Sequence, residues 1–383
     1  MSHNYHIPTL PLAADLETRE ILRQVNLASR RLAELKGVAN VMPNEDILLQ
    51  TLTLQEAKDS SAIENIVTTQ DEIFKAELSV KEFMVSIATK EVLNYRAAMQ
   101  EGFREVRRSK LLTNKTILHI QERLEKNNAG FRALPGTTLQ NAQQEVVYTP
   151  PQSAEEVKAL MANLEKFINE PDICELDPLI KLAIIHHQFE SIHPFYDGNG
   201  RTGRIVIVLY LVLNDLLDLP ILYLSRYINR HKVDYYRRLQ AVRDSDGAAS
   251  DWQAWILFIL KGIEETAQST IQLVNGIADL MTQFKQKLRP LFGRLYKHEL
   301  LNNLFFHPYT KIEFVARDMQ VHRHTAQKYL DKIVDKGLLR KVKVSRSNYY
   351  VNMPLCELFI RQGHTKEEAE ELIKSFLLEE TKG

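Results

Sequence analysis

The sequence predicts a mainly α-helical protein that carries one small β-hairpin and ends in a winged helix-turn-helix domain. Hydrophobic residues recur at helical spacing along most of the chain. Turn-forming residues between positions 126 and 152 enclose a single short β-prone run, which predicts a hairpin among the helices. After Pro290 the helical segments become short and are followed by two more β-prone runs, the order of elements in a winged helix.

The N-terminal region is organised by the helical spacing of its apolar residues. The expected elements are a helix over 16–37 that ends near Gly37, a helix over 47–57, a separate short segment at 60–66, and further helices to about Leu124. Thr69 and Glu72 lie three residues apart and fit a capping box, in which each side chain accepts a hydrogen bond from the other residue's backbone N–H. This pair predicts that a helix begins directly after Thr69.

The middle of the chain holds the hairpin and a long helix. The β-prone run is Glu145–Tyr148, with turn-forming residues on both sides. Asp177 is a suitable N-cap and Pro178 a suitable first-turn residue for a helix that would begin there and end before Pro194. Pro194 should stop that helix, because a proline moves the residue before it out of the α region.

The next helix is expected to be buried. A loop at 195–200 leads into a helix from about Arg201 to Asp218, which is apolar on all sides from Ile205 to Leu213. A helix that is hydrophobic all round belongs in the core of a protein. Further helices are expected from Arg230 to about Lys287.

The composition is that of a folded protein without a strong overall charge. Of 383 residues, 44% are hydrophobic and 26% charged, with 49 basic residues balancing 49 acidic ones. This balance excludes a global attraction to nucleic acid or membranes, so any such attraction must come from a local patch. The longest apolar run falls far short of the ~20 residues needed to cross a bilayer. We find no signal peptide in Met1–Ala13, and the two cysteines are far apart, so we expect a cytoplasmic protein that does not contact membranes.

The C-terminal domain is predicted from short segments. Its helices are expected near 293–305, 311–318 and 323–336, and its β-prone runs are Leu338–Lys343 and Ser347–Val351. Three short helices followed by a β-hairpin make a winged helix-turn-helix.

Charge in this domain suggests a partner. Between Pro308 and Val351 six lysines and four arginines stand against one glutamate and three aspartates, a net charge of +6. The candidate recognition helix offers Arg323, His324, Gln327 and Lys328, and the candidate wing offers Lys343 and Arg346. DNA binding is one interpretation. Docking of protein substrates or of a second subunit is the other, because winged helices do both.

The stretch 193–204 carries the residues for a chemical reaction. It reads His-Pro-Phe-Tyr-Asp-Gly-Asn-Gly-Arg-Thr-Gly-Arg, so a helix delivers a histidine, a glycine-rich loop follows, and a second helix begins with two arginines. Helix N-termini bind anions, and glycines allow the backbone to approach a phosphate closely. Histidine has the unperturbed pKa best suited to a general base near neutral pH, and a carboxylate is a ligand that Mg²⁺ uses between phosphates.

These residue types together indicate phosphoryl or nucleotidyl transfer. Arg201 and Arg204 are three residues apart, so they share one helix face and can bind the same polyphosphate. The chain has no GxxxxGK[ST] sequence, so it is not a P-loop enzyme. The alternative is a simple Gly/Asn turn with solvated arginines, which explains poorly why His193, Asp197 and both arginines converge beside a buried helix.

The stretch matches the motif HxFx(D/E)GNGRxxR at every fixed position, and the chain resembles Fic-type protein adenylyltransferases. The resemblance covers about residues 8–265 and includes the run Glu145–Tyr148, which is similar to the family's flap. It implies a Fic helical bundle that transfers AMP from ATP, with Mg²⁺, to a tyrosine, serine or threonine hydroxyl. It also suggests three domains: 1–110, 111–287 for the catalytic core, and 288–383 for the winged helix and a C-terminal helix.

The resemblance assigns a role to each residue of the motif. His193 would deprotonate the target hydroxyl, Asp197 would hold Mg²⁺, and Arg204 would pair with the γ-phosphate. The remaining ATP contacts would come from Gly198, Asn199, Gly200, Arg201, Thr202, Gly203 and Tyr235. Tyr235 would line the adenine pocket, although ordinary helix packing explains a tyrosine there equally well. The flap residues Gln143, Gln144, Glu145 and Val146 would pair with the backbone of the target.

An inhibitory segment is implied near 58–66. Ser60, Glu64 and Asn65 fit the family pattern [ST]xxxE[GN], in which the glutamate binds the second arginine of the motif and displaces the γ-phosphate. ATP would then occupy a non-productive pose, which makes Glu64 an ATP-site residue as well. The alternative is an ordinary surface glutamate on a helix.

Several alternatives stay open. The chain could be a hydrolase that removes AMP with Glu64 positioning water, or a DNA-binding regulator whose Fic core only senses nucleotide. Arg243 stands where the family has a second purine contact, normally asparagine, so a donor other than ATP is a further alternative. Asn141–Gln144 replaces a Trp-Ile-Gly-Gly-type turn, which leaves the target open. The expected partners are an unidentified target protein, the chain itself as a target, and DNA; formation of a homodimer is left open.

Overall fold

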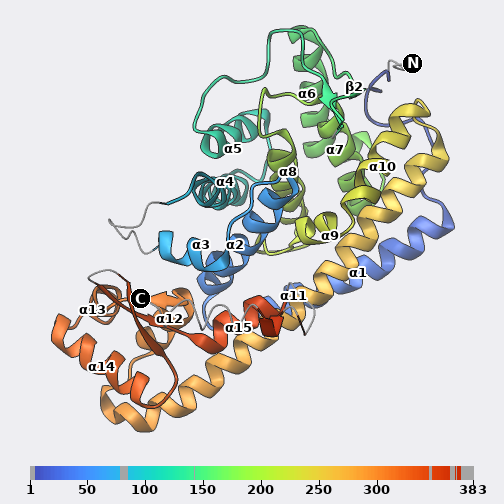
Figure 1. Ribbon diagram of the computed structural model, residues 1–383. Helices are drawn as coiled ribbons and strands as arrows, with labels where there is room; N and C mark the ends of the chain where they lie inside the picture. Colours follow the sequence, from blue (N-terminus) through green and yellow to red (C-terminus); the bar gives the residue numbers. More distant parts are fainter. Residues whose placement is uncertain are drawn as a thin grey trace. The chain divides into compact units, whose positions relative to one another are not determined.

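The computed structural model describes residues 5–77, 85–141, 143–344, 347–362, 367 and 369–371, and it is mainly helical (Figure 1). The chain divides into two compact units. The first comprises 1–37, 52–67 and 90–268, and the second comprises 38–51, 68–89 and 269–383. In the part of the chain that is described, no helix is long and apolar enough to cross a membrane.

The first unit is a helical bundle with a small hairpin. Its residues come from α1 (Arg19–Asn40), α2 (Glu45–Ile63), α4 (Ile87–Ser109), α5 (Asn114–Glu125), β1 (Leu139–Gln140), β2 (Val146–Tyr148), α6 (Ala154–Asn169), the 3-10 helix η1 (Pro171–Ile173), α7 (Pro178–Ile192), α8 (Asn199–Leu213), α9 (Leu224–Arg230), α10 (Lys232–Asp244) and α11 (Ala249–Phe292). The helices α7 and α8 pack against each other at its centre, and α5, α6 and α9 pack around them.

The central helices confirm the predicted core. Asp177 caps α7 through a side-chain bond from the backbone N–H of Leu179, and Pro178 occupies the first turn. Every residue from Ile205 to Val212 of α8 is buried. The predicted bounds of α8 were wrong at both ends, because it begins at Asn199 with Gly198 as its N-cap and stops at Leu213 rather than Asp218.

One predicted helix end near the N-terminus comes too early, and one predicted break there is wrong. The helix α1 continues through Gly37 to Asn40, and the predicted separate segment that starts at Ser60 is instead the last turn of α2. A glycine inside a helix costs about 1 kcal/mol relative to alanine. The burial of Leu35 and Ala39 on either side of Gly37 outweighs this cost.

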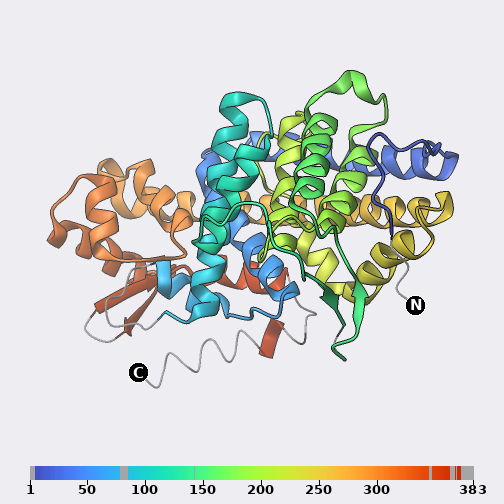
Figure 2. The same cartoon turned by 90° about the horizontal axis from the view of Figure 1, so that it is seen from above.

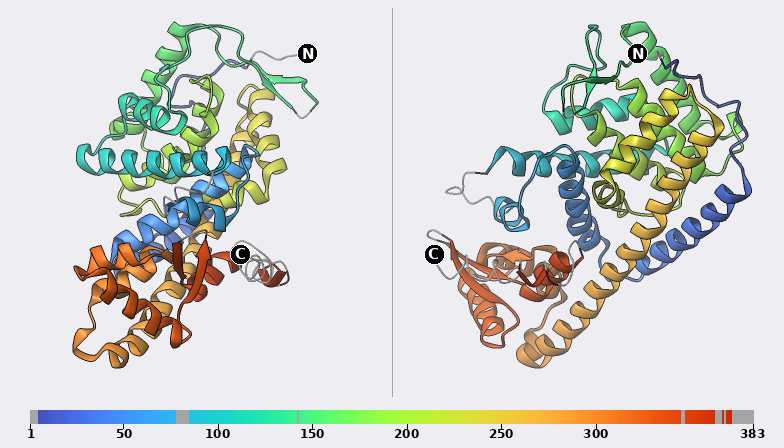
Figure 3. Two further views of the ribbon diagram at one scale, coloured as in Figure 1. Left: turned by 60° about the vertical axis from the view of Figure 1, so that its left-hand side comes forward. Right: turned by 45° about the vertical axis from the view of Figure 1, so that its right-hand side comes forward.

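The hairpin is the predicted β element, and it projects from the helices of the first unit (Figure 2; Figure 3, left). Leu139 pairs with Tyr148 in an antiparallel register. The Asn141 side chain accepts bonds from the backbone N–H groups of Gln143 and Glu145, which closes the turn. The buried Tyr148 donates its hydroxyl to the Ser191 carbonyl at 2.9 Å, so the hairpin is anchored on α7.

The second unit contains short helices and a three-stranded sheet. Its further elements are α3 (Gln70–Glu77), the 3-10 helix η2 (Gly293–Leu295), α12 (His298–Phe306), β3 (Tyr309–Thr310), α13 (Ile312–Met319), α14 (Arg323–Asp335), β4 (Arg340–Val344), β5 (Ser347–Val351) and α15 (Met353–Arg361). The capping box before α3 is confirmed, with Glu72 N–H to Thr69 Oγ1 at 3.1 Å and Thr69 N–H to Glu72 Oε2 at 3.0 Å.

The C-terminal elements follow the predicted order. Three short helices precede the antiparallel hairpin β4–β5, and the sheet order is β3-β5-β4. The two-residue strand β3 was missed because so short a strand leaves no pattern in the sequence. The winged-helix interpretation stays a prediction, and Arg346, which was predicted to belong to the wing, lies outside the described residues.

Candidate active site

The site begins where α7 ends at a histidine. Pro194 prevents α7 from continuing, and His193 closes the helix in a left-handed conformation with φ 48° while its N–H bonds the Phe189 carbonyl. The loop then returns to α8 through Asn199. The Asn199 side chain exchanges two bonds of 2.8 Å with the backbone N–H and carbonyl of Phe195, so this residue stabilises the loop from within.

Two glycines at the start of α8 lie in close contact with the ends of charged side chains. Gly198 has φ 76°, and a Cβ there would lie 2.3 Å from Glu125 Oε1. A Cβ on Gly200 would lie 2.5 Å from Glu64 Oε1 and 2.9 Å from Arg204 Nη1. The missing Cβ atoms let the carboxylates of Glu125 and Glu64 approach the first turn of α8, where the unpaired N–H groups of a helix N-terminus favour anions.

Arg204 is held by the segment predicted to be inhibitory. Its Nη2 lies 2.8 Å from Glu64 Oε1, and its Nε and Nη2 donate to the Ser60 hydroxyl and carbonyl at 2.8 and 3.0 Å. The arginine side chain is 2% exposed, whereas that of Glu64 is 35% exposed. Burial alone would raise the pKa of Glu64, but attraction to Arg204 and the hydrogen bond from it bring that pKa below its ordinary value.

The backbone conformation of Asn65 explains why the pattern [ST]xxxE[GN] has glycine or asparagine after the glutamate. Asn65 has φ 61°, a left-handed conformation that these two residue types adopt most readily. Lys232 Nζ donates to the Ile63 carbonyl at 2.6 Å and to Asn65 Oδ1 at 3.3 Å, so α10 holds the end of α2. The lysine satisfies a carbonyl that the helix end would otherwise leave unpaired.

His193 and Arg204 line one cavity of about 920 Å³. The side chains around it come from the end of α2, the hairpin, α7, α8 and α10: Ile63, Glu64, Asn65, Thr138, Leu139, Gln140, Asn141, Val147, Glu190, His193, Gly200, Arg204, Lys232, Val233, Tyr235, Tyr236, Arg237, Leu239, Gln240 and Arg243. A base, a buried guanidinium and a helix N-terminus thus meet at a space large enough for a nucleotide.

The electrostatics of the cavity favour a neutral His193. Burial, with the positive charges of Arg243 and Arg132, lowers the pKa of His193 to about 4. Its Nδ1 is buried without a hydrogen-bond partner. The imidazole is therefore uncharged at neutral pH and able to accept a proton.

Family models match three stretches of the chain. The model of the Fic/DOC family N-terminal region matches residues 22–104, that of the Fic/DOC family matches 111–211, and that of the C-terminal domain of SoFic-like protein adenylyltransferases matches 280–355. Residues 22–104 and 111–211 are thus similar to the two regions of Fic/DOC family proteins.

Solved structures of Fic proteins share the fold. A Fic family protein from Desulfovibrio desulfuricans G20 superposes with a TM-score of 0.57 at 21% identity, over 90% of this chain and 98% of that one. A Fic domain containing signaling protein from Bacteroides thetaiotaomicron VPI-5482 superposes with a TM-score of 0.54 at 20% identity, over 65% of this chain and 97% of that one. At these identities the likeness establishes the fold alone.

Curated relatives match a shorter stretch. Protein adenylyltransferase fic-1 of Caenorhabditis elegans is 24% identical over 143 residues, which are 37% of this chain and 26% of the relative. Protein adenylyltransferase Fic of Aedes aegypti is 29% identical over 160 residues, which are 41% of this chain and 30% of the relative. The match therefore spans less than a third of the length of either relative.

The first arginine of the Fic motif does not line the cavity. Arg201 is buried, and its guanidinium lies 2.7 Å from Glu91 Oε2 and 2.9 Å from Glu125 Oε1. Neither glutamate is close to the motif in sequence, so no local pattern could have identified them. Only Arg204 of the two arginines therefore reaches the cavity in this arrangement.

Asp197 fits a magnesium ligand. Its side chain is exposed beside the start of α8, and its Oδ1 accepts the Gly198 N–H at 2.7 Å. Mg²⁺ is usually bound by one or two carboxylates together with substrate phosphates, so a lone carboxylate at a phosphate-binding helix end is sufficient. Among the described residues, no three His, Cys, Asp or Glu side chains gather into a metal site of their own.

Other Fic motif residues face the protein interior. The hydroxyl of Thr202 is buried without a partner, and a Cβ on Gly203 would lie 2.9 Å from both Phe189 and Glu190 of α7. Neither residue lines the cavity. Gly203 therefore permits the close approach of α7 and α8.

Tyr235 lines the cavity but is buried, and its hydroxyl lies 2.9 Å from His186 Nε2. The neighbouring Tyr236 is 43% exposed and lines the same cavity, so it is the more accessible aromatic ring. Sequence reasoning missed Tyr236, because two adjacent tyrosines on a helix of unknown orientation give no sign of which one is exposed.

The hairpin borders the cavity with residues other than those predicted. Thr138–Asn141 and Val147 line it, whereas Gln143, Gln144 and Glu145 lie in the turn and Val146 in β2. Sequence reasoning also missed Glu190. It is buried, it lines the cavity, and its Oε1 has no partner.

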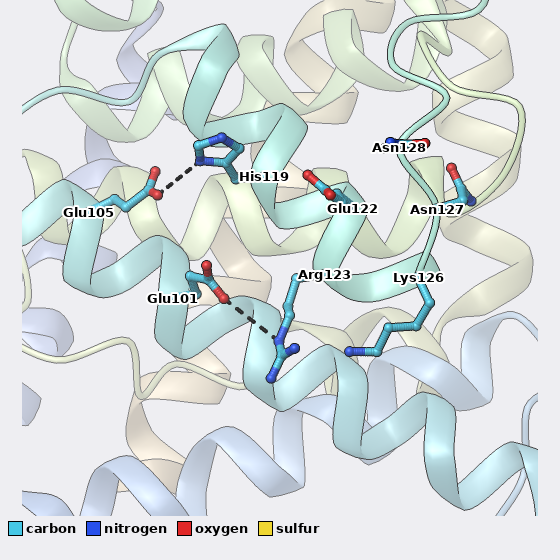
Figure 4. A pocket seen from close by; sticks show the side chains of 8 residues that line it. All are labelled: Glu101, Glu105, His119, Glu122, Arg123, Lys126, Asn127 and Asn128. Carbon is cyan, nitrogen blue, oxygen red and sulfur yellow. Dashed lines mark hydrogen bonds and ion pairs between the residues drawn. The ribbon is translucent and has the colours of Figure 1, made fainter.

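A second hollow of about 730 Å³ lies between α4 and α5, away from the Fic motif (Figure 4). It contains the ion pairs His119–Glu105 and Arg123–Glu101, whose nitrogen–oxygen distances are 3.0 and 3.7 Å. These side chains are partly exposed, so the pairs contribute little to stability. The hollow carries no residue of the proposed chemistry and supplies control positions for experiments.

Proposed function

We propose that this chain is an autoinhibited protein adenylyltransferase that transfers AMP from Mg-ATP to a tyrosine, serine or threonine hydroxyl of a target protein or of itself. The observation that carries the proposal is the shared cavity, in which a neutral His193 and the buried Arg204 meet beside the N-terminus of α8. The relatives named protein adenylyltransferase support the same activity.

The reaction uses residues that the cavity already holds. The first N–H groups of α8 and the Arg204 guanidinium would bind the triphosphate, because they place positive charge on one side of the cavity. His193 would accept the proton of the target hydroxyl as its oxygen forms a bond to the α-phosphorus. The bond to the β-phosphate oxygen then breaks, and pyrophosphate leaves. Magnesium held by Asp197 would neutralise part of the phosphate charge.

The hairpin would position the target. Its strands border the cavity, and Val146 and Val147 of β2 are exposed hydrophobic residues. An extended target segment that added a strand to this two-stranded sheet would gain backbone hydrogen bonds without requiring a particular sequence. Its hydroxyl residue would then face the cavity.

Autoinhibition follows from the contact between Glu64 and Arg204. A carboxylate oxygen of Glu64 pairs with the Arg204 guanidinium, which would otherwise bind the γ-phosphate. ATP would therefore bind with its phosphates displaced from the line between His193 and the α-phosphorus. The lowered pKa of Glu64 supports a contact between two charged groups at neutral pH.

The test of the proposed function is mass spectrometry of the protein after incubation with Mg-ATP. We expect an added adenylyl group on the Glu64→Gly protein, and its loss when EDTA is present. Appearance of the α-phosphorus label on protein, but no γ-phosphorus label, separates AMP transfer from phosphorylation. Equal labelling with and without EDTA would contradict the role of Asp197, and labelling by neither isotope would contradict the activity.

The second unit would bind a partner of its own, and we propose that this partner is duplex DNA. Exposed basic or imidazole side chains gather on the first turns of α14 and on β4: His322, Arg323, His324, Lys328 and Lys343. Arg323 keeps 74% of its side chain exposed although its Nε lies 3.3 Å from Glu313. The exposed arginine and lysine side chains among them suit a phosphate backbone.

We expect the double variant Arg323→Ala, Lys328→Ala to weaken binding of a fluorescent DNA duplex. Each lost phosphate contact should reduce the slope of log K against log salt by about one, so the expected change is about two. Arg123→Ala, outside this unit, is the control. A duplex affinity that is the same in the double variant and the control would show that α14 serves another partner.

A further inference from the structure

A short segment before the hairpin runs along the residues that follow α7. The ring of Phe131 packs on Phe195 with centroids 5.4 Å apart. The backbone N–H of Arg132 donates to the Pro194 carbonyl at 2.8 Å. The next two N–H groups, at 133 and 134, donate to the Tyr196 hydroxyl at 3.0 and 3.1 Å. Residues 131–134 therefore form a continuous support for residues 192–196.

The Arg132 side chain completes this support at the end of α7. Its Nε donates to the His193 carbonyl at 2.7 Å and its Nη2 donates to the Ile192 carbonyl at 3.1 Å. The last carbonyls of a helix have no partner within the helix, and a guanidinium bonds them more strongly than a neutral donor does. Arg132 is 2% exposed, so water does not compete for these bonds.

The backbone conformation of His193 depends on such support. A left-handed φ of 48° is unfavourable for a residue with a Cβ, and it persists only where the surroundings determine it. Arg132 binds the carbonyls of three consecutive residues, His193 being the central one.

We propose that Arg132 is a positioning residue for His193, which it holds in the left-handed conformation that directs the imidazole into the cavity. The inference rests on the proposed function, since it concerns the base of that reaction. The charged groups that face His193 agree with it. Besides burial, Arg243 of α10 and Arg132 lower its pKa, while Glu64 at the end of α2 raises it.

The experiment compares Arg132→Met and Arg132→Lys in the Glu64→Gly protein. Methionine keeps roughly the length of the side chain but removes the charge and the donors. Lysine keeps the charge but replaces the planar guanidinium with one compact ammonium group. We expect kcat of Arg132→Met to fall about 100-fold, because a small displacement of a catalytic group has that effect. Arg132→Lys should lose about 10-fold, and KM for ATP should change less than about threefold in both.

The pKa of His193 provides a readout that a merely structural role would not move. Removing a cation favours the imidazolium, so the pKa of His193 should rise in Arg132→Met and stay in Arg132→Lys. The acid limb of the pH–rate profile should move to higher pH accordingly. Titration of the His193 ring by NMR measures the same quantity in protein with no transferase activity.

The outcomes separate the inference from the function. An unchanged kcat and an unchanged His193 titration in Arg132→Met would overturn the positioning role. If Arg132→Met does not fold, as judged by thermal melting, Arg132→Lys decides: wild-type kcat in that variant would overturn the inference. Absence of AMP transfer in the Glu64→Gly parent itself would contradict the proposed function, and the NMR titration would still decide the role of Arg132. Arg123→Met, in the hollow between α4 and α5, is the control.

Discussion

Replacing His193 with alanine is expected to lower AMP transfer at least about 100-fold, the lower end of what a general base contributes. ATP binding should survive, because in the proposed site the N-terminus of α8 and Arg204, rather than the imidazole, would hold the triphosphate. Transfer is measured as α-phosphorus label on protein, and binding by calorimetry with ATP and Mg²⁺. The Glu64→Gly protein is the background for both.

The pH dependence follows from the pKa of about 4 for His193. A base acts only when it is deprotonated, so transfer should be independent of pH across the neutral range and fall as the pH approaches 4 from above. An acid limb near 6.5, the ordinary value for histidine, would show that His193 is more exposed or less affected by Arg243 and Arg132 than the structure indicates.

The matched control is His119→Ala, which removes a partly exposed histidine from the hollow between α4 and α5 (Figure 4). It should leave transfer unchanged. If His193→Ala retained more than about a tenth of parental transfer, the loss would be too small for a general base. The hydroxyl would then have to be activated by another group.

Much of the fold could be predicted because the information was local. The capping box at Thr69 and Glu72, the N-cap at Asp177 and the stop at Pro194 each depend on residues within one helical turn. The mainly helical class and the burial of 205–212 followed from periodicity, which the structure confirms.

The errors arose where tertiary contacts overruled local preference. Gly37 reads as a helix end, yet α1 continues because its neighbours are buried. Ser60 reads as a new segment, yet it lies on α2, where its hydroxyl meets Arg204. Competition between propensity and packing cannot be settled from a sequence, because the packing partner lies far along the chain.

The candidate site was predictable mainly where its residues belong to a short sequence pattern, either the motif 193–204 or the pattern of Ser60, Glu64 and Asn65. His193 and Arg204 were found because their spacing is fixed by one loop and one helix turn. Arg132, Lys232 and Glu91 act on the site from distant positions, and each is a single charged residue without a pattern around it. Their roles became visible only through hydrogen bonds between elements.

Acid would not serve to release the proposed autoinhibition. The pKa of Glu64 lies below its ordinary value, so the stabilisation from its pair with Arg204 is complete above that ordinary value and is lost as the pH falls through the lowered one. His193, with its pKa of about 4, becomes protonated in the same acidic range. The contact therefore persists at neutral pH, and release requires removal of Glu64 from the cavity.

Replacing Glu64 with glycine should raise self-AMPylation at least tenfold. Arg204 would lose its carboxylate partner but keep its bonds to the Ser60 hydroxyl and carbonyl, so the guanidinium stays oriented and becomes available to the γ-phosphate. Tenfold corresponds to about 1.4 kcal/mol in the barrier. Glycine at 64 follows the end of α2 at Ile63, so it does not interrupt the helix. Incorporation of label from ATP into the protein over time measures the effect.

The control variants separate release of Arg204 from other effects. Glu64→Gln keeps the shape and one hydrogen bond but removes the charge, so it should activate less than Glu64→Gly. Adding Arg204→Ala to Glu64→Gly should abolish the gain, because the released group is then absent. A hydrolase that needs Glu64 to orient water would behave differently: starting from AMPylated protein without ATP, it would lose AMP in the parent and retain it in Glu64→Gly. If Glu64→Gly alters neither transfer nor removal of AMP, the contact with Arg204 is structural and the chain is not autoinhibited by Glu64.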